Sequence, residues 1–397
     1  MTNQTKRGGL GSEITGLMHK NIRNYAMYIA LAVIFIVFQI LSKGAFLTAR
    51  NLTNLINQTG YIAVMAVGMT LVLIICQIDL SVGYVAGFLG ACAAQLLLRG
   101  VPAGLAVLII LIAGALIGLL QGLVIGRIGV PAFVTTLACE FIFRGLLTLV
   151  TEASGTIPVT NEVFNNLSNG FLPEVFMIGQ LHGLTIIVGL LAIVAIIVSQ
   201  IRQRKELKKY NFEIVSMPIF VFKIVFFTAL IAALTYVLAA YNGLSWTIVI
   251  VALIAGVYAF VMNKTRTGRY IYGMGGNREA AALSGVNVRR VLIGVFTSMG
   301  CMAALGGILY TSRLGAATPT AGNGFELDAI ASGYIAGVST TGGIGSVISS
   351  VVGAFVIMSL TNGLNLLHIS SYVQMIIKGL VIIGAVGIDI LKNRKKQ

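Results

Sequence analysis

The sequence predicts an all-α, polytopic membrane protein with about twelve transmembrane helices. Hydrophobic residues make up 57% of the 397 residues, and charged residues make up only 10%, whereas soluble domains carry about 25% charged residues. Many apolar runs approach the length of about 20 residues that a helix needs to cross a bilayer. Because lipid offers the backbone no hydrogen-bonding partners, these runs must be helical. The uneven distribution of Lys and Arg between the runs supports the same fold class.

The predicted helices form one transmembrane domain, 25–391, between a polar N-terminal segment, 1–24, and a basic tail, 392–397. A long loop, 152–182, separates the fifth and sixth helices and contains no Lys or Arg. We expect helices at 25–42, 61–78, 81–98, 103–126, 131–151, 183–200, 217–240, 244–262, 291–313, 326–341, 347–367 and 372–391.

The charge pattern predicts the orientation of these helices. If the chain starts in the cytoplasm and crosses at each predicted helix, the external segments and helix ends hold only Lys43, Arg50, Arg99 and Arg313. Most other Lys and Arg residues then lie in cytoplasmic segments, which is the usual bias of membrane proteins. We therefore predict a multi-pass protein of a bacterial cytoplasmic membrane with both termini in the cytoplasm. The formal charge of +15 then needs no nucleic acid to explain it.

A weak internal similarity links the fourth and eleventh predicted helices. Gln121-Gly122-Leu123 lies at the inner end of the fourth helix, and Asn362-Gly363-Leu364 lies near the outer end of the eleventh. The two triplets would run in opposite directions through the membrane, as inverted repeats do. Chance similarity in a chain rich in Gly and Leu explains the triplets equally well.

The predicted cytoplasmic loop 263–290 contains the clearest local signal for a short helix. Asn277 is a favourable N-cap, Glu279 suits the positive first turn, and Gly285 suits the end of the helix. Such an exposed helix could dock into a groove on a partner. The alternative is a solvated loop between two spans. The residues that would make the contact are Asn277, Arg278, Glu279, Ala280, Ala281, Leu283 and Gly285.

Motifs in this loop and elsewhere resemble the ribose/xylose-type, multiple-monosaccharide permeases of the ABC transporter superfamily. The Glu279-Ala280-Ala281 triplet resembles the signature of the family's coupling loop. Further matches follow in the expected order at 68–72 with 78–83, 131–146, 325–331, 342–346 and 362–367. The resemblance covers about 45–150 and 263–391. Between these parts, 183–240 is identified as a helical hairpin added to a family-like core of about ten helices.

The resemblance implies the permease subunit of an ATP-driven, binding-protein-dependent importer of xylose or of several pentoses and hexoses. The expected partners are a cytoplasmic ATP-binding subunit with tandem ATPase domains, an extracytoplasmic sugar-binding protein, and a second permease copy or close homologue. The alternatives are an ion-coupled secondary sugar transporter with inverted repeats and a receptor or scaffold without transport activity.

Several charged residues fall within or beside the predicted spans. Asp79 with Ser81, and Asp328, are expected to act as structural caps of helix starts. Glu140 and Arg144 stand four residues apart on one helix, where we expect them to pair. Lys378 lies deep in a span, and the sequence offers no partner for it.

Other polar residues in the spans could line a path for a hydroxylated solute. Hydrogen bonding between helices is the alternative explanation for each of them. The candidates are Asn54, Gln58, Gln77, Thr136, Asn362, Asn365 and Gln374.

The sequence lacks the signals of a catalytic subunit. The glycine-rich stretch 268–276 has neither the Lys nor the hydroxyl residue of a P-loop. We therefore expect no cofactor on this chain and place ATP and Mg on the partner ATPase. The three His and four Cys residues are scattered, so no catalytic residue, disulfide or metal site is predicted.

Overall fold

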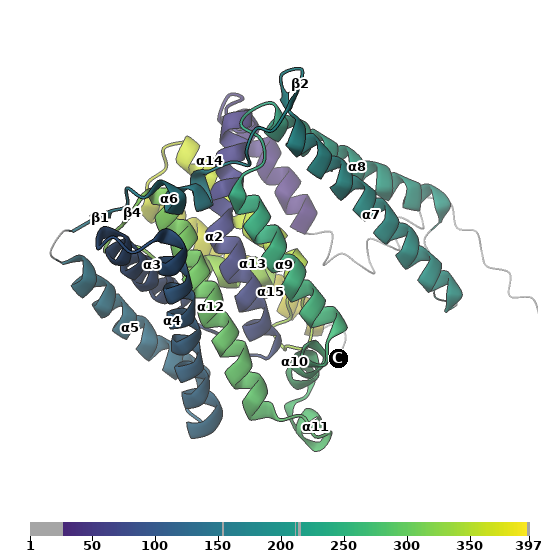
Figure 1. The fold of residues 1–397 in the computed structure, drawn as a ribbon. Coiled ribbons are helices and arrows are strands. Elements are labelled where there is room, and N and C mark those ends of the chain that lie inside the picture. The colour runs from purple at the N-terminus through teal and green to yellow at the C-terminus, as the bar shows by residue number, and fades with distance from the viewer. Residues whose placement is uncertain (1–26, 153–154, 211, 213–215, 395–397) are drawn as a thin grey trace, which may run out of the picture.

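The structure, a computed structural model, describes residues 27–152, 155–210, 212 and 216–394. It is a bundle of long helices in which the N-terminal and C-terminal halves of the chain interleave (Figure 1). The predicted N-terminal segment, 1–24, and residues 395–397 of the tail lie outside the described residues. We refer to the two ends of the bundle as the α6 end and the α11 end, after the short helices α6 (Glu162–Asn169) and α11 (Arg278–Leu283) found there.

The helices follow the order expected from the sequence. They are Met27–Leu41, α2 (Ala49–Ile74), α3 (Val82–Leu98), α4 (Ala103–Leu123), η1 (Val124–Ile128), α5 (Ala132–Thr151), α6 (Glu162–Asn169), α7 (Gly183–Lys209), α8 (Met217–Ala239), α9 (Trp246–Lys264), α10 (Arg266–Gly276), α11 (Arg278–Leu283), α12 (Val288–Leu314), α13 (Phe325–Ile335), α14 (Val347–Leu366) and α15 (Ser371–Arg394). The short strands are β1 (Ile157–Pro158), β2 (Met177–Ile178), β3 (Leu181–His182) and β4 (Ala316–Ala317).

Eight helices in the described part of the chain are long and apolar enough to cross a membrane. This confirms the prediction of a polytopic helical membrane protein. The second helix is longer than predicted, because it begins at Ala49 and not at 61. Its polar first turns are stabilised by Thr48, whose hydroxyl accepts a hydrogen bond from the backbone N–H of Asn51 at 3.4 Å. Hydropathy alone does not reveal this polar extension of an apolar helix.

Helix α2 is the centre of the bundle. Its apolar segment is 89% buried, and α9, α12, α13 and α14 all pack against it. At the level of Gly68 it meets Met299 and Met302 of α12. Because other helices surround its apolar segment, α2 forms the core of the bundle.

The tenth predicted span, 326–341, is shorter than expected. Its helix, α13, ends at Ile335 after 11 residues, which is about 16 Å at 1.5 Å per residue. This is about half the thickness of the bilayer core. Gly337, Gly342 and Gly343 all adopt positive φ angles, so the chain turns where the apolar pattern suggested a continuing helix. A glycine adopts these angles without the strain of a side chain.

Helices α4 and α12 pack closely through small residues. A side chain at Gly114, Gly118 or Gly122 would meet the backbone of α12 at Gly300, Phe296 or Ile293. Small residues at such spacing let two helix backbones approach each other in membranes. The spacing of these glycines is therefore explained by helix packing.

Replacing Gly118 with Leu is expected to destabilise the protein, because the new side chain has to displace the backbone of Phe296. Overpacking of this kind costs about 1–3 kcal/mol. The measurement is the midpoint of thermal unfolding in detergent. Gly104→Leu is the matched control, since Gly104 lies on the same helix and a Cβ added there would meet no atom within 4 Å. Equal midpoints for the two variants would contradict the packing explanation.

Helices α7 and α8 form a hairpin that leans away from the bundle (Figure 1). The apolar segments of α7 and α8 are only 11% and 0% buried. Helix α8 approaches the N-terminal helix, where the rings of Tyr28 and Phe227 lie 6.3 Å apart. Apolar helices with so little protein contact are suited to a lipid environment.

The predicted loop 152–182 is partly folded onto the bundle. Its helix α6 begins at the N-cap Asn161 and buries Phe164 completely. The backbone N–H of Ser168 donates to the hydroxyl of Ser312 on α12 at 2.9 Å. Strand β1 pairs with β4, which follows α12. The loop thus covers the end of α12.

Candidate functional site

The local signals at 277–285 form a helix, α11. The side-chain oxygen of Asn277 accepts a hydrogen bond from the backbone N–H of Ala280 at 2.9 Å, as an N-cap does. Glu279 lies in the first turn, where its charge complements the helix N-terminus. Gly285 follows with a φ of 84°, which favours glycine. The predicted short helix is therefore present.

Helix α11 presents an apolar side chain to solvent. Leu283 is 91% exposed, whereas Ala281 is 7% exposed and faces the bundle. A single exposed leucine is ordinary on a protein surface. Leu283 is the last residue of α11, a short helix that projects from the end of the bundle (Figure 1). An apolar residue exposed in this way is available as an anchor for the groove of a partner.

Helix α10 connects α11 to the core. At Gly275 a side chain would collide with the carbonyl of Ile74, the last residue of α2. The Tyr272 hydroxyl donates to the carbonyl of Gly345 at 2.9 Å, just before α14. Burial raises the pKa of Tyr272, so its phenol keeps the proton that it donates. Helix α10 thus contacts the end of α2 and the segment just before α14.

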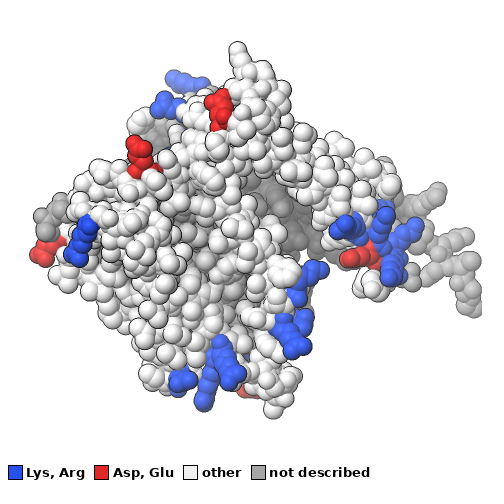
Figure 2. All heavy atoms as spheres, in the orientation of Figure 1, with Lys and Arg blue, Asp and Glu red and all other residues white. Residues whose placement is uncertain are grey.

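Positive charge surrounds α11. Figure 2 shows the Lys and Arg residues on the visible face concentrated at the α11 end and at the tip of the α7–α8 hairpin. The exposed arginines near α11 are Arg266, Arg269, Arg278, Arg289 and Arg290. A partner with acidic groups at the rim of its groove would complement this surface.

Five of the seven polar residues predicted to line a path fall into two groups, and the other two, Asn365 and Gln374, bond to each other in the network described below. Asn54 and Asn362 lie towards the α6 end, where they bond to other side chains: Arg313 donates to Asn54 at 3.1 Å, and Asn51 donates to Asn362 at 2.9 Å. Gln58 lies one turn further along α2 than Asn54 and is partly exposed. These contacts join α2 to α12 and α14. The two asparagines therefore serve helix packing in the described conformation.

The second group lies towards the α11 end. The Thr136 hydroxyl is buried and donates to the carbonyl of Ile78 at 3.4 Å. The side chain of Gln77 donates to the neighbouring carbonyl of Cys76 at 2.9 Å. Both residues belong to the turn between α2 and α3 or to the helix that supports it. The structure thus does not gather the seven predicted path residues into one site.

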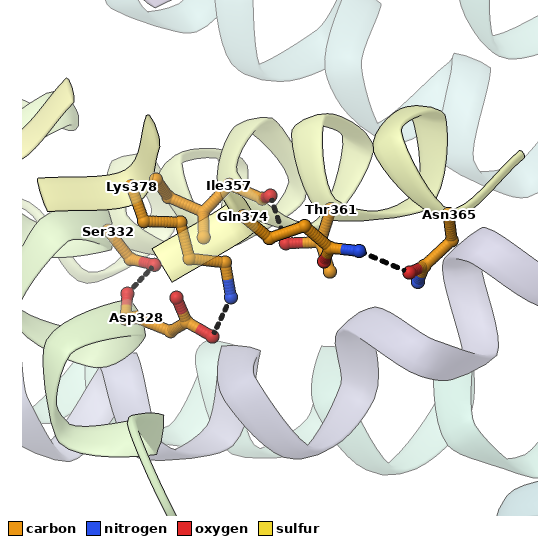
Figure 3. A network of polar contacts seen from close by, with 7 residues as sticks. All are labelled: Asp328, Ser332, Ile357, Thr361, Asn365, Gln374 and Lys378. Atoms are coloured by element: carbon orange, nitrogen blue, oxygen red, sulfur yellow. Dashed lines mark hydrogen bonds and ion pairs between the residues drawn. The ribbon is translucent and has the colours of Figure 1, made fainter. Parts of the chain in front are cut away.

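A buried network joins α13, α14 and α15 (Figure 3). Lys378 donates to a carboxylate oxygen of Asp328 at 2.8 Å, and both side chains are largely buried. One turn away, Gln374 donates to Asn365 at 2.7 Å. Ser332 donates to the backbone carbonyl of Asp328. Lys378, for which the sequence offered no partner, is therefore neutralised by an aspartate that lies 50 residues earlier in the chain.

This pairing changes the interpretation of Asp328 as a cap. Asp328 lies in the first turn of α13, as expected, but Gly324 occupies the N-cap position and provides no side chain. The carboxylate is directed to Lys378 on α15. The partner of this buried carboxylate is therefore Lys378, and the expected role of Asp328 as a cap is not what its side-chain contact shows.

Asp79 and Ser81 hold the turn between α2 and α3. Asp79 is buried, and its carboxylate accepts hydrogen bonds from the backbone N–H and the hydroxyl of Ser81, at 2.9 and 2.7 Å. Gln121 of α4 donates to the same hydroxyl at 2.8 Å. Ser81 occupies the N-cap of α3 without a capping side-chain bond. These contacts fix the turn to α4.

The predicted ion pair between Glu140 and Arg144 is not found within the described residues. The guanidinium of Arg144 lies over the ring of Tyr84, 5.6 Å from its centroid. This contact turns Arg144 towards α3. Spacing along one helix permits an ion pair, but the neighbouring helix offers the arginine an aromatic face.

Comparisons with known proteins identify the class of the chain. Residues 51–386 match the family described as branched-chain amino acid transport system / permease component. The match covers well over half of the chain. The protein belongs to this permease family, and within it to the ribose/xylose-type permeases of ABC transporters.

The relatives are sugar permeases of similar length. The xylose transport system permease protein XylH of Haemophilus influenzae is 34% identical, over 95% of this chain and 98% of the relative. XylH of Escherichia coli is 35% identical, over 96% and 95%. The ribose import permease protein RbsC of Escherichia coli is 36% identical, over 93% of each. No solved structure matches the chain.

Proposed function

We propose that the protein is the membrane-spanning permease subunit of an ATP-driven importer of monosaccharides, with xylose or several pentoses and hexoses as substrates. The observation that carries the proposal is the projecting helix α11 with its exposed Leu283, in a chain that belongs to the ribose/xylose-type permeases. The names of the relatives support sugar as the substrate class. A permease of this kind carries no catalytic residues of its own.

The proposed orientation places α11 in the cytoplasm of a bacterium, with the chain in the inner membrane and both termini on the cytoplasmic side. The arginines around α11 support this orientation, since cytoplasmic segments of membrane proteins are enriched in Lys and Arg. The loop that contains α6 then faces outward. A secreted sugar-binding protein would deliver the solute to that side.

In the proposed mechanism, α11 docks on a cytoplasmic ATPase subunit with tandem ATPase domains, which binds ATP and Mg. Closure of the ATPase domains moves α11, and α10 passes the movement to the ends of α2 and α14 through Gly275 and Tyr272. The helices of this chain and of a second permease copy then change access from outside to inside. The ATP-bound and ATP-free states must bind the two conformations with different affinities for this to work.

Reconstitution in proteoliposomes tests the proposal. The permease, reconstituted with its ATPase and binding protein, is expected to take up labelled xylose or ribose. Uptake is expected only when ATP and Mg are present on the side of the membrane that carries the ATPase. An ion-coupled secondary transporter is the alternative, because the opposed Gln121 and Asn362 triplets are compatible with inverted repeats. This alternative predicts that the permease alone takes up sugar when an ion gradient is imposed across the membrane. That result would overturn the proposal.

A further inference from the structure

Helix α5 (Ala132–Thr151) lies at the edge of the bundle, where it packs mainly against α3. Its apolar segment is only 17% buried. The buried side of the helix contains residues such as Thr136 and Leu147. The opposite side is not covered by other helices of the described chain. One edge of this uncovered side carries polar residues, and the other edge carries apolar residues.

One edge of the open side of α5 is polar. Glu140, Arg144, Thr148 and Glu152 follow one another at intervals of four residues and therefore lie along one side of the helix. Arg144, Thr148 and Glu152 are exposed, and Glu140 is half-buried. A shallow, open depression on this surface is lined by Phe141, Arg144, Gly145, Thr148, Leu149 and Glu152. The other edge, around Ile142, is apolar and exposed, as expected of a surface in contact with lipid.

Two of these charges lie deep in the membrane. Glu140 and Arg144 are the ninth and thirteenth of the 20 residues of α5, so each is about 10 Å or more from the nearer end of the helix. The guanidinium of Arg144 lies over the ring of Tyr84 and is thereby held against α3. Charged residues at this depth face a water-filled cavity or other protein, and not lipid.

A third carboxylate lies close to this edge. Glu326, in the first turn of α13, is 9% exposed, and its Oε2 atom has no hydrogen-bond partner in the described part of the chain. The carboxylate lies against Gly83, next to Tyr84. The ring of Tyr84 is also the surface over which the Arg144 guanidinium lies, 5.6 Å from the centroid. Residues from α3, α5 and α13 thus form one polar cluster at mid-membrane depth.

We propose that this edge of α5, with Glu140 and Arg144 at its centre, binds the monosaccharide during its passage through the membrane. The inference rests on the proposed function and assigns the passage to residues other than those expected from the sequence. Carboxylate and guanidinium groups form charge-assisted hydrogen bonds with the adjacent hydroxyl groups of a sugar. The described chain leaves the edge open, and in this proposal the same edge of a second permease copy forms the opposite wall.

The test compares Arg144→Gln and Glu140→Gln with the control Ile142→Ala in proteoliposomes that contain the ATPase and the binding protein. Labelled xylose and ribose are the probes. Each polar variant is expected to lower sugar uptake about tenfold or more, because each removes a charged hydrogen-bond partner. Basal ATP hydrolysis and co-purification with the ATPase are expected to persist. The Ile142→Ala variant is expected to transport like the native protein.

A second measurement tests access to water without relying on transport. Arg144→Cys is expected to react with a membrane-impermeant maleimide in the assembled complex, and added xylose is expected to slow the reaction. Ile142→Cys is expected to remain unlabelled. Fragment-resolved mass spectrometry distinguishes these sites from the native Cys139. Equal labelling of Arg144→Cys and Ile142→Cys overturns the inference. So does native sugar uptake by both Arg144→Gln and Glu140→Gln, or failure of these two variants to assemble with the ATPase. A native complex that takes up no sugar would instead refute the proposed function.

Discussion

Replacing Lys378 with Ala is expected to lower the free energy of unfolding by about 3–5 kcal/mol, because it leaves a buried carboxylate without its counter-charge. Lys378 and Asp328 are joined at 2.8 Å, and their side chains are 19% and 8% exposed. Replacing Asp328 with Ala is expected to have a similar effect from the opposite side. The measurement is the thermal midpoint of the purified permease in detergent, followed by its retention of a single peak in size-exclusion chromatography.

The double variant Asp328→Leu with Lys378→Met provides the decisive comparison. It removes both charges and keeps apolar volume, so most of the lost stability should return. Lys223→Met is the matched single control, since Lys223 is exposed and its ammonium bonds to Gln200 at 3.0 Å. That change is expected to be nearly neutral. If the double variant is no more stable than the Lys378→Ala and Asp328→Ala single variants, the ion pair is not what holds α13 to α15.

Replacing Leu283 with Asp is expected to abolish most of the ATP hydrolysis that depends on sugar and binding protein, while the permease itself stays folded. Leu283 is 91% exposed, so the isolated chain loses almost no contact. Burial of a leucine in a partner's groove is worth about 1.5–3 kcal/mol, which corresponds to about a tenfold to hundredfold loss of affinity. The measurement is stimulated ATPase activity in the reconstituted complex.

The conservative variant Leu283→Met serves as the control for this prediction. It keeps an apolar side chain of similar volume, so coupling should be nearly native. Glu279→Arg tests the same surface by reversing the charge in the first turn of α11. Unchanged thermal midpoints are expected for all three variants. Native coupling in both Leu283→Asp and Glu279→Arg would remove α11 from the proposed ATPase interface.

The sequence predicted helix α11 well because its signals are local. A capping side chain, an acidic first turn and a terminal glycine act over a few residues, and the structure places Asn277, Glu279 and Gly285 in those positions. The apolar helices were predicted for a similar reason, since each must satisfy its own backbone in lipid. The predicted length of α13 was wrong, because the apolar pattern continues through glycines at which the chain turns.

The candidate site was less predictable, because it depends on which helices are neighbours. Thr136 and Asn362 look like path residues in the sequence, yet each finds a protein partner on another segment. Rare charges of opposite sign in separate spans, such as Asp328 and Lys378, offered a signal that could have been read as a pair. No sequence signal indicated that Arg144 is exposed, because the sequence does not show which side of α5 other helices cover.

The amino-acid sequence by itself therefore determined the class of the protein, the order of its helices and the short helix α11. Backbone satisfaction in lipid and local capping act along the chain, so they can be read from residue order. Only the tertiary structure decided that Asp328 neutralises Lys378, that α2 is enclosed by the other helices, and that one charged edge of α5 stays open. Those features depend on contacts between distant segments, which side-chain identity permits but does not specify.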